Sequence, residues 1–208
     1  MEYSLLALKA PSNIEKKVRE LQSSLYRQVG LVSALALPVI IPLCFIAPGV
    51  VPAKRAELRD SLRRAAGKEA PYLNSKSVAE DNGFLYWDLT PRRELQRLRR
   101  NCEKVFAPAA AQQDDRQGTR QPDLFPVARG FLLCSLQGRS RAMMPSLSVP
   151  EPLLFPAKAA FLLRFHSLGV ELGRTEQNAS TTEGRPWWKS LFWEKLEEIP
   201  LRKSGEGG

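Results

Sequence analysis

The sequence has few of the side chains from which metal sites and disulfide frameworks are built. Its 208 residues include three cysteines, Cys44, Cys102 and Cys134, and a single histidine, His166. The cysteines lie far apart within apolar patterns, and no CxxC or Cys/His spacing is present. This spacing excludes the common zinc motifs and a disulfide framework, and it predicts buried, reduced thiols. We expect a protein without a metal or any other cofactor.

The sequence also lacks the pattern of a secretory signal. The N-terminal MEYSLLALKAPSNIEKK has an acidic second residue, Glu2, and no long apolar core. A signal peptide requires both a basic start and an apolar core of at least about seven residues. Together with the reduced thiols, this predicts a cytoplasmic location.

The sequence has fewer acidic than basic residues. The chain has 22 Asp and Glu against 31 Lys and Arg, which leaves a formal net charge of +9. Such an excess favours polyanionic partners, namely RNA, DNA or an anionic membrane surface. It carries no information about the fold, and a role in solubility alone explains it equally well.

Charge is absent altogether from Gln28 to Ala53. As one helix this stretch would cross a bilayer, for which about 20 apolar residues suffice. Four prolines interrupt it, however, and each costs about 3 kcal/mol in a helix interior. The β-branched and aromatic segment Val39–Ile46 instead predicts a central strand, buried on both faces, in a soluble domain. A single-span membrane protein is the alternative. The prolines are Pro38, Pro42, Pro48 and Pro52.

The order of the remaining segments predicts a single α+β domain over residues 1–203. Amphipathic helices are expected from Ser12, over 52–68 and from Thr90 to Phe106, where apolar residues recur at helical spacing. Expected strands cover residues 3–8, 39–46, 84–89, 131–136, 160–172 and 187–201. Three such helices outside a two-lobed, mostly antiparallel sheet define the architecture. Residues 108–123 and 138–152 are predicted to be flexible loops, and residues 204–208 a disordered tail.

Two of these helices begin with sequence signals for capping. Ser12 and Glu15 have the spacing of a capping box, in which each side chain bonds the other residue's backbone N–H. Thr90 followed by Pro91 predicts an N-cap with proline at the first helical position.

The second and third helices carry basic faces. On the second they are Arg55, Arg59 and Arg63, and on the third Arg92, Arg93, Arg97, Arg99 and Arg100. Such a face can neutralise several phosphates and so give salt-dependent binding of nucleic acid. Aromatic residues that would stack unpaired bases are scarce beside it, and a plain solvated face is the alternative.

The order of the elements and several segments resemble the 2H phosphoesterases, the family of the 2′,5′ RNA ligases and cyclic phosphodiesterases. Ser4–Leu8, followed by Pro11, is similar to the family's first strand. Ile40–Ala47 stands where the family has a His-x-Thr-x-x-Phe strand, and Phe84–Leu89 and Ile199–Leu201 fit later strands. The resemblance implies a 2H phosphoesterase-like fold and a substrate or ligand that contains a nucleotide phosphate.

The residues that perform the family's chemistry do not match. In the family, two His-x-Thr motifs face each other across a cleft and supply an acid and a base. Here Ile40 and Pro42 occupy the first motif, and the second falls within Pro126–Phe131, with Pro126 and Ala128 at motif positions. No register supplies a histidine there. Acid–base catalysis contributes about 10²–10⁴-fold per group, so the resemblance implies a scaffold without the reaction.

We therefore expect a non-catalytic, monomeric protein of this type that binds RNA or a nucleotide phosphate in a basic cleft. Arg129, beside the permissive Gly130, could hold a phosphate bidentately without doing chemistry. A phosphodiesterase with relocated catalytic residues, using His166 or Arg129, is a further alternative, although no orienting carboxylate lies near His166 in sequence. The expected phosphate or RNA ligands are Arg129, Arg164, Arg92, Arg93, Arg97 and Arg100.

Overall fold

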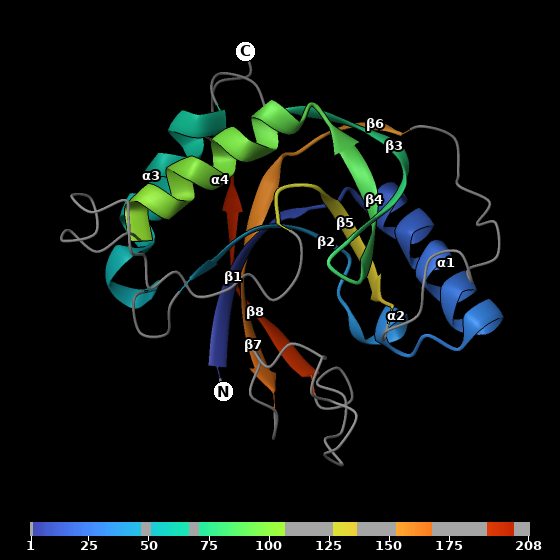
Figure 1. Cartoon of the computed structure of the whole chain (residues 1–208). Helices are drawn as coiled ribbons and strands as arrows, with labels where there is room; N and C mark the ends of the chain where they lie inside the picture. The colour runs from blue at the N-terminus through green and yellow to red at the C-terminus, as the bar shows by residue number, and fades with distance from the viewer. Residues whose placement is uncertain are drawn as a thin grey trace.

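Two four-stranded antiparallel sheets form the framework of the protein (Figure 1). The computed structural model describes residues 2–46, 51–66, 71–106, 127–136, 153–167 and 191–201. Sheet A has the order β2-β1-β7-β8, and sheet B has the order β5-β4-β3-β6. The strands are β1 (Glu2–Lys9), β2 (Ile40–Ile46), β3 (Tyr72–Asp81), β4 (Phe84–Thr90), β5 (Gly130–Ser135), β6 (Leu154–Pro156), β7 (Ala159–Ser167) and β8 (Leu191–Pro200).

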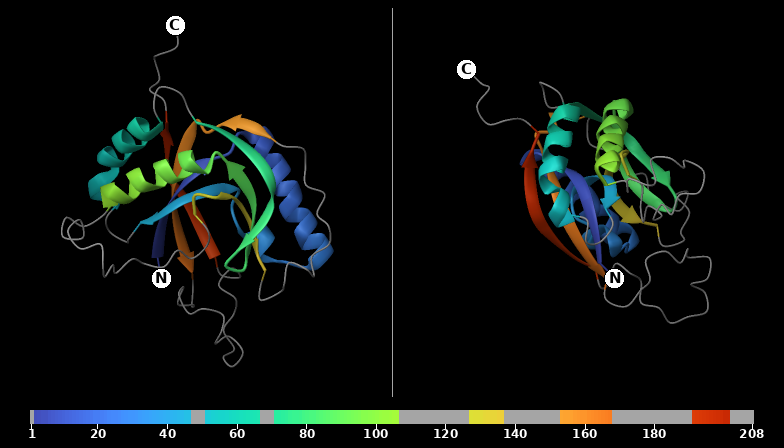
Figure 2. Two further views of the ribbon diagram at one scale, coloured as in Figure 1. Left: turned by 45° about the horizontal axis from the view of Figure 1, so that its top comes forward. Right: turned by 90° about the vertical axis from the view of Figure 1, so that its left-hand side faces the viewer.

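Helices cover the outer sides of both sheets, as the expected α+β architecture requires. They are α1 (Ser12–Val29), the short α2 (Ser33–Ala36), α3 (Val51–Ala66) and α4 (Arg92–Phe106). Figure 2 shows α3 and α4 side by side at one side of the molecule and α1 at the other. Helix α4 contacts β2, whereas α1 and α2 contact β5. The predicted apolar stripes are buried: on α1 Ile14, Val18, Leu21 and Leu25, and on α4 Leu95, Leu98, Cys102 and Val105.

The uncharged stretch from 28 to 53 is not one helix. It contains the end of α1, all of α2, the strand β2 and the start of α3, while residues 47–50 lie outside the described part. Strand β2 is buried on both faces, as predicted, with Ile41 and Leu43 fully inside. No helix in the described ranges is long and apolar enough to cross a bilayer.

The prediction that β2 is a central strand is wrong, because β2 is an edge of sheet A. Its pairing with β1 shifts register between Leu6 and Ala7, next to Pro42. A proline is tolerated at such a place because it has no N–H to contribute to a ladder. The Pro42 carbonyl accepts a hydrogen bond of 2.7 Å from the Ala128 N–H instead. The outer edge of β2 is thus joined to the chain entering sheet B.

Both predicted helix caps are wrong. Pro11 is the N-cap of α1, and no side chain caps the helix. Its carbonyl accepts the N–H groups of Ile14 and Glu15 at 2.9 and 2.8 Å, which places Ser12 inside the first turn. Thr90 ends β4, and its hydroxyl donates a hydrogen bond of 3.3 Å to the Asn74 carbonyl of β3. Helix α1 thus begins one residue earlier than its capping signal suggests, whereas β4 continues through Thr90 and delays the start of α4.

Strand β3 was not anticipated from the sequence, although a signal for it exists. Asn82 and Gly83, with φ of 49° and 74°, join β3 to β4. Positive φ at both central residues is typical of a tight hairpin, for which Asn-Gly is the preferred pair. Strand β6 was also missed, because three residues carry no recognisable period. The predicted loops at 108–123 and 138–152 and the tail at 204–208 lie outside the described residues.

The three cysteines are buried and none forms a disulfide, as the sequence predicts. A hydrogen bond with Cys102 and burial raise the pKa of Cys44 well above its ordinary value. Burial raises the pKa of Cys134 to about 12. The thiols of Cys44 and Cys134 are therefore protonated at neutral pH, and neither is an activated nucleophile.

Alkaline pH should destabilise the protein through these thiols. The folded state keeps protons that the unfolded chain releases near the ordinary pKa of 9.0, so stability is complete below that pH. Between pH 9 and 12 the free energy of unfolding should fall by about 1.4 kcal/mol per pH unit through Cys134. The raised pKa of Cys44 makes the fall above pH 9 steeper. Urea unfolding at a series of pH values measures this slope. Cys134→Ala should remove the contribution of that thiol and make the slope less steep. An unchanged slope in this variant would contradict the raised pKa of Cys134.

Candidate functional site

The two segments expected to carry catalytic motifs lie next to one another. Strand β2 supplies Ile40 and Pro42, and the chain entering β5 supplies Ala128. The hydrogen bond from the Ala128 N–H to the Pro42 carbonyl joins the segments directly. Ile40 is 2% exposed and Ala128 is fully buried, with a positive φ of 52°. Pro126 lies outside the described residues.

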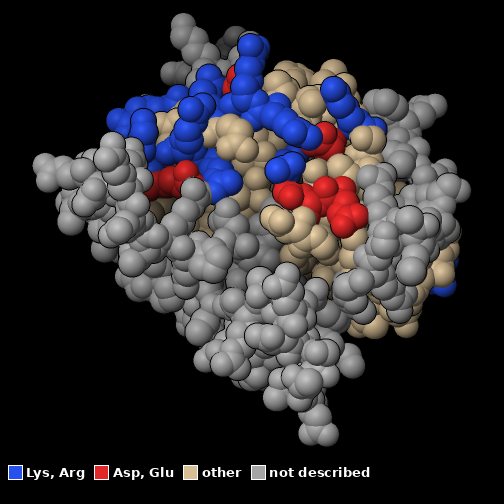
Figure 3. Space-filling model, viewed as in Figure 1, with Lys and Arg blue, Asp and Glu red and all other residues tan. Residues whose placement is uncertain are grey.

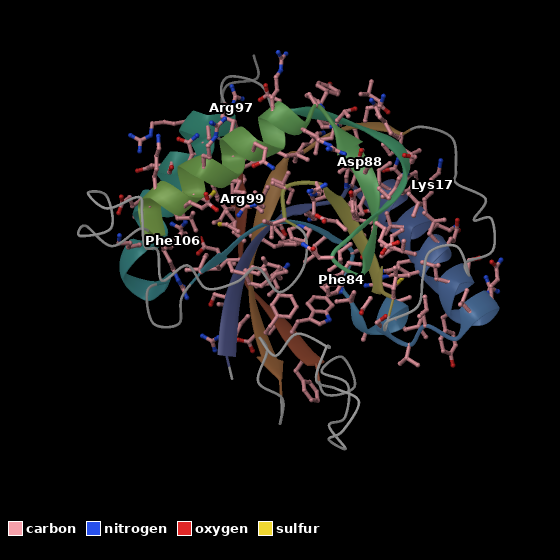
Figure 4. The ribbon with its side chains drawn as sticks, in the orientation of Figure 1. Lys17, Phe84, Asp88, Arg97, Arg99 and Phe106 are labelled. Atoms are coloured by element: carbon pink, nitrogen blue, oxygen red, sulfur yellow. The ribbon has the colours of Figure 1, made fainter. Side chains whose placement is uncertain are left out.

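Side chains between the sheets at this point are apolar. Ile40 belongs to a buried group, here called the inter-sheet cluster, which joins sheet A to β5 of sheet B. Its members are Leu5, Ala7, Leu37, Ile40, Leu132, Leu163 and Phe165. Phe45, Phe84 and Phe161 pack against it, and Figure 4 shows Phe84 at the end of β4 remote from α4. None of the side chains in the inter-sheet cluster can donate or accept a proton.

Gly130 is required by the packing of two strands. A Cβ atom built on Gly130 would lie 2.0 Å from the Trp87 carbonyl oxygen on β4. The close backbone approach that the sequence suggested at this glycine is therefore made by β4 itself. Its neighbour, the Arg129 carbonyl, accepts the Leu89 N–H at 3.0 Å and completes the junction of β5 with β4.

Arg129 is held by groups of sheet B. Its Nε lies 3.0 Å from a carboxylate oxygen of Asp81, and a terminal nitrogen donates to the Tyr86 hydroxyl at 3.3 Å. The guanidinium also stands 5.9 Å from the centre of the Tyr86 ring. A phosphate would have to compete with Asp81 for this arginine. The charge beside Arg129 is therefore mixed, with the Asp81 carboxylate next to the guanidinium.

A second ion pair joins β4 to the start of α4. Asp88, which pairs with Gly130 in the ladder, is 7% exposed and accepts a hydrogen bond of 2.9 Å from Arg92. Asp88 raises the pKa of Arg92 above its ordinary value, chiefly through this bond. Figure 4 shows Asp88 on β4 close to the start of α4. Arg92 is thus tied to sheet B by its own carboxylate partner.

A cluster of two lysines, a phenylalanine and a glutamate on sheet A was not predicted from the sequence. The ammonium groups of Lys9 and Lys195 lie 5.4 and 5.2 Å from the centre of the Phe161 ring. Glu198 accepts a bond of 2.8 Å from Lys9 and is 3.5 Å from Lys195. The hydrogen bond from Lys9 lowers the pKa of the Glu198 carboxyl. Because these residues come from β1, β7 and β8, only the strand pairing brings them together.

The remaining predicted ligands do not form one site. Arg164 lies on β7 and pairs with Glu194 at 3.2 Å. In the backbone ladders of sheet A, His166 of β7 stands opposite Glu2 of β1 and Phe192 of β8. Its side chain is outside the described part of the structure. In the described ranges no three His, Cys, Asp or Glu side chains are placed to hold a metal ion. Arg92, Arg93, Arg97 and Arg100 all belong to α4.

Basic side chains gather on the surface formed by α3 and α4 (Figure 3). Among the arginines that form ion pairs in the described ranges, Arg93 is the most exposed, with 87% of its side chain accessible. Figure 4 shows Arg97 and Arg99 on opposite sides of α4. The prediction that Arg99 faces solvent is wrong: its side chain is 15% exposed and bonds Glu103 at 2.8 Å.

A groove of about 380 Å³ separates α3 from α4 on this surface. It was missed at the sequence level, although the spacing that creates it is present. Residues 57, 61 and 64 on α3 and residues 97, 101 and 104 on α4 recur every three or four positions, which places each set on one helix face. The groove is lined by Glu57, Ser61, Arg64, Ala65, Arg97, Asn101, Lys104 and Val105.

The arrangement of two antiparallel sheets with α1 beside one and α3 and α4 beside the other is a LigT-like 2H phosphoesterase fold. A structure described as a phosphoesterase is similar over 98% of this chain and 100% of its own, with a TM-score of 0.60 and 12% identity. Escherichia coli LigT complexed with NADP+ is similar over 97% and 99%, with a TM-score of 0.56 and 13% identity.

LigT complexed with 3′-AMP gives the same coverage, with a TM-score of 0.55 and 13% identity. No family model matches the chain, and no curated protein matches it. Similarity at this level of identity concerns the fold alone. It confirms the architecture that the order of elements predicts.

Proposed function

We propose that this protein is a non-catalytic member of the 2H phosphoesterase type that binds RNA or a nucleotide phosphate. The observation that carries the proposal is the inter-sheet cluster. Ile40 occupies the position of one expected proton-transfer residue and is buried among apolar side chains. Ala128, at the second position, is fully buried and engaged through its backbone with Pro42. Neither side chain can act as acid or base, so two contributions of about 10²–10⁴-fold each are lost.

Loss of the acid and base leaves the electrostatic part of binding intact. The chain carries a net charge of +9, and the arginines of α4 lie on an open helical surface. LigT has been solved with 3′-AMP and with NADP+, which makes a phosphate-containing nucleotide a reasonable ligand class for this fold. We propose that the phosphate contacts lie on α4 and its surroundings, because α4 carries six basic residues against two acidic ones, whereas Arg129 stands alone with Asp81. The buried reduced thiols support a cytoplasmic location.

Binding to short single-stranded RNA should be strongly salt-dependent. Each phosphate contacted contributes about −0.7 to the slope of log K against log salt for a single strand. Three to four contacts by the α4 arginines would lower the affinity about 20- to 50-fold between about 50 and 200 mM salt. Fluorescence anisotropy with labelled RNA measures the slope. Absence of binding at the lower salt, or binding that salt leaves unchanged, would contradict the proposal.

The same preparation tests the claim that no catalysis remains. Incubation with a 2′,3′-cyclic nucleotide should give no hydrolysis above the uncatalysed rate, because no acid–base pair lies at the junction of β2 and β5. Turnover that disappears in His166→Ala would overturn the non-catalytic assignment. It would instead support a phosphodiesterase whose catalytic residues have moved.

A further inference from the structure

We propose that the groove between α3 and α4 is a phosphate-binding subsite, formed on the helical surface and separate from the junction of the two sheets. It would take a backbone phosphate of single-stranded RNA. The inference rests on the proposed function and adds to it the place where the phosphate is held. Its first support is the charge of the lining: Arg64, Arg97 and Lys104 contribute three cations, against one carboxylate from Glu57.

The two helices run in opposite directions along the groove. Lys54 Nζ donates to the Val105 carbonyl at 2.5 Å, and Ser61 Oγ donates to the Asn101 carbonyl at 3.1 Å. The start of α3 therefore lies beside the end of α4, and Arg64 belongs to the end of the groove nearest Arg97. Glu57 belongs to the opposite end, together with Lys104. The two guanidinium groups are thus separated from the carboxylate of Glu57 along the groove.

The guanidinium groups differ in how they are held. Arg97 bonds Glu94 at 2.6 Å, and about half of its side chain is exposed. Arg64 is exposed and has no carboxylate partner within the part of the chain that the structure describes. Arginine offers a planar pair of donors that matches two phosphate oxygens, and one phosphate can accept from two arginines. At this end of the groove the Arg97 guanidinium is therefore oriented by Glu94, and the Arg64 guanidinium is free to bind a phosphate.

The floor of the groove is fixed by polar contacts between the helices. Ser61 is 7% exposed and bonds the backbone of α4, while the Asn101 side-chain amide donates to the Arg97 carbonyl at 2.8 Å. The Ser61 bond, together with the bond from Lys54 to the Val105 carbonyl, joins α3 to α4. The Asn101 bond lies within α4 and orients the amide side chain at the groove. The volume of about 380 Å³ exceeds that of a phosphate alone and leaves room for an attached sugar. Ligand sites begin at about 300 Å³.

The test uses a double variant and a control with the same change in net charge. Arg64→Gln/Arg97→Gln removes both guanidinium groups from the groove. Lys16→Gln/Arg27→Gln removes two exposed cations from α1, on the other side of the molecule. The groove variant should weaken RNA binding about tenfold or more and reduce the salt slope by about 1.4, whereas the control should change affinity less than about threefold. Circular dichroism verifies that both variants fold.

A second probe separates this subsite from RNA binding in general. Adenosine 5′-monophosphate should shift the backbone amide signals of α3 and α4 and the Asn101 side-chain amide in a nitrogen–proton correlation spectrum. Adenosine, which lacks the phosphate, should not. If RNA binds and the groove variant behaves as the control does, the subsite is wrong and the proposed function stands. If RNA fails to bind while the monophosphate shifts these signals, the assignment of an RNA phosphate to the groove is wrong, and the proposed function holds only for a nucleotide phosphate. If neither ligand binds, both are wrong.

Discussion

Gly130→Ala should destabilise the folded protein by about 3 kcal/mol or more, because the added methyl group has no space. Its Cβ would lie 2.0 Å from the Trp87 carbonyl oxygen and 2.7 Å from the carbonyl carbon. These are backbone atoms inside the β4–β5 ladder, so no side-chain rotation relieves the overlap. The strands would have to separate where Trp87 and Phe131 are both fully buried. Urea unfolding followed by tryptophan fluorescence gives the change in midpoint.

Gly30 provides the matched control for this substitution. It ends α1 with a left-handed φ of 72°, and a Cβ there would meet no atom within 4 Å. Gly30→Ala should therefore cost only the conformational strain, about 1–2 kcal/mol. A loss at Gly130 no greater than that at Gly30 would show that the contact with β4 is not the reason for glycine. An unchanged protein that loses RNA binding would instead assign Gly130 to the ligand.

Phe131→Ala should cost about 3–5 kcal/mol, the range for truncating a buried aromatic side chain. Phe131 is fully buried on β5, with its ring centre 6.4 Å from that of Trp87 and 5.6 Å from that of Phe155. It therefore connects β4, β5 and β6 across sheet B. Truncation would remove these ring contacts and leave a cavity that rigid strands cannot close.

Two further variants test this interpretation of Phe131. Phe131→Leu keeps most of the volume and should cost less than about 1.5 kcal/mol. Leu154→Ala, on the neighbouring β6, changes a side chain that is 70% exposed and should alter stability by about 0.5 kcal/mol or less. Equal losses for alanine and leucine at 131 would contradict a cavity cost. Neither Phe131 variant should change RNA affinity under conditions where it is folded.

These two residues show why the region of the second expected motif is structural in this chain. Gly130 accommodates a neighbouring backbone and Phe131 fills sheet B, while Ile40 fills the space between the sheets. The segments to which the sequence resemblance assigns the two motifs therefore support packing in this structure. The cationic residues of α3 and α4 lie outside this region, which is why binding and stability can be tested independently.

Local pattern was sufficient to predict much of the chain. The 3.6-residue spacing of apolar residues located α1, α3 and α4, and runs of β-branched and aromatic residues located β1, β2, β4, β5, β7 and β8. The absence of histidine at Ile40 and Ala128 is likewise a property of the sequence, and it needs no coordinates. These features depend on neighbours within one helix turn or one strand, which the sequence specifies directly.

Tertiary structure alone decided which of these residues meet. The pairing of Arg129 with Asp81, the approach of Gly130 to Trp87 and the edge position of β2 all join residues distant in the sequence. The groove between α3 and α4 arises because two stripes at helical spacing happen to face each other across a helix pair. Periodicity shows that such a stripe exists, but the partner of each side chain is determined by how sheets and helices pack.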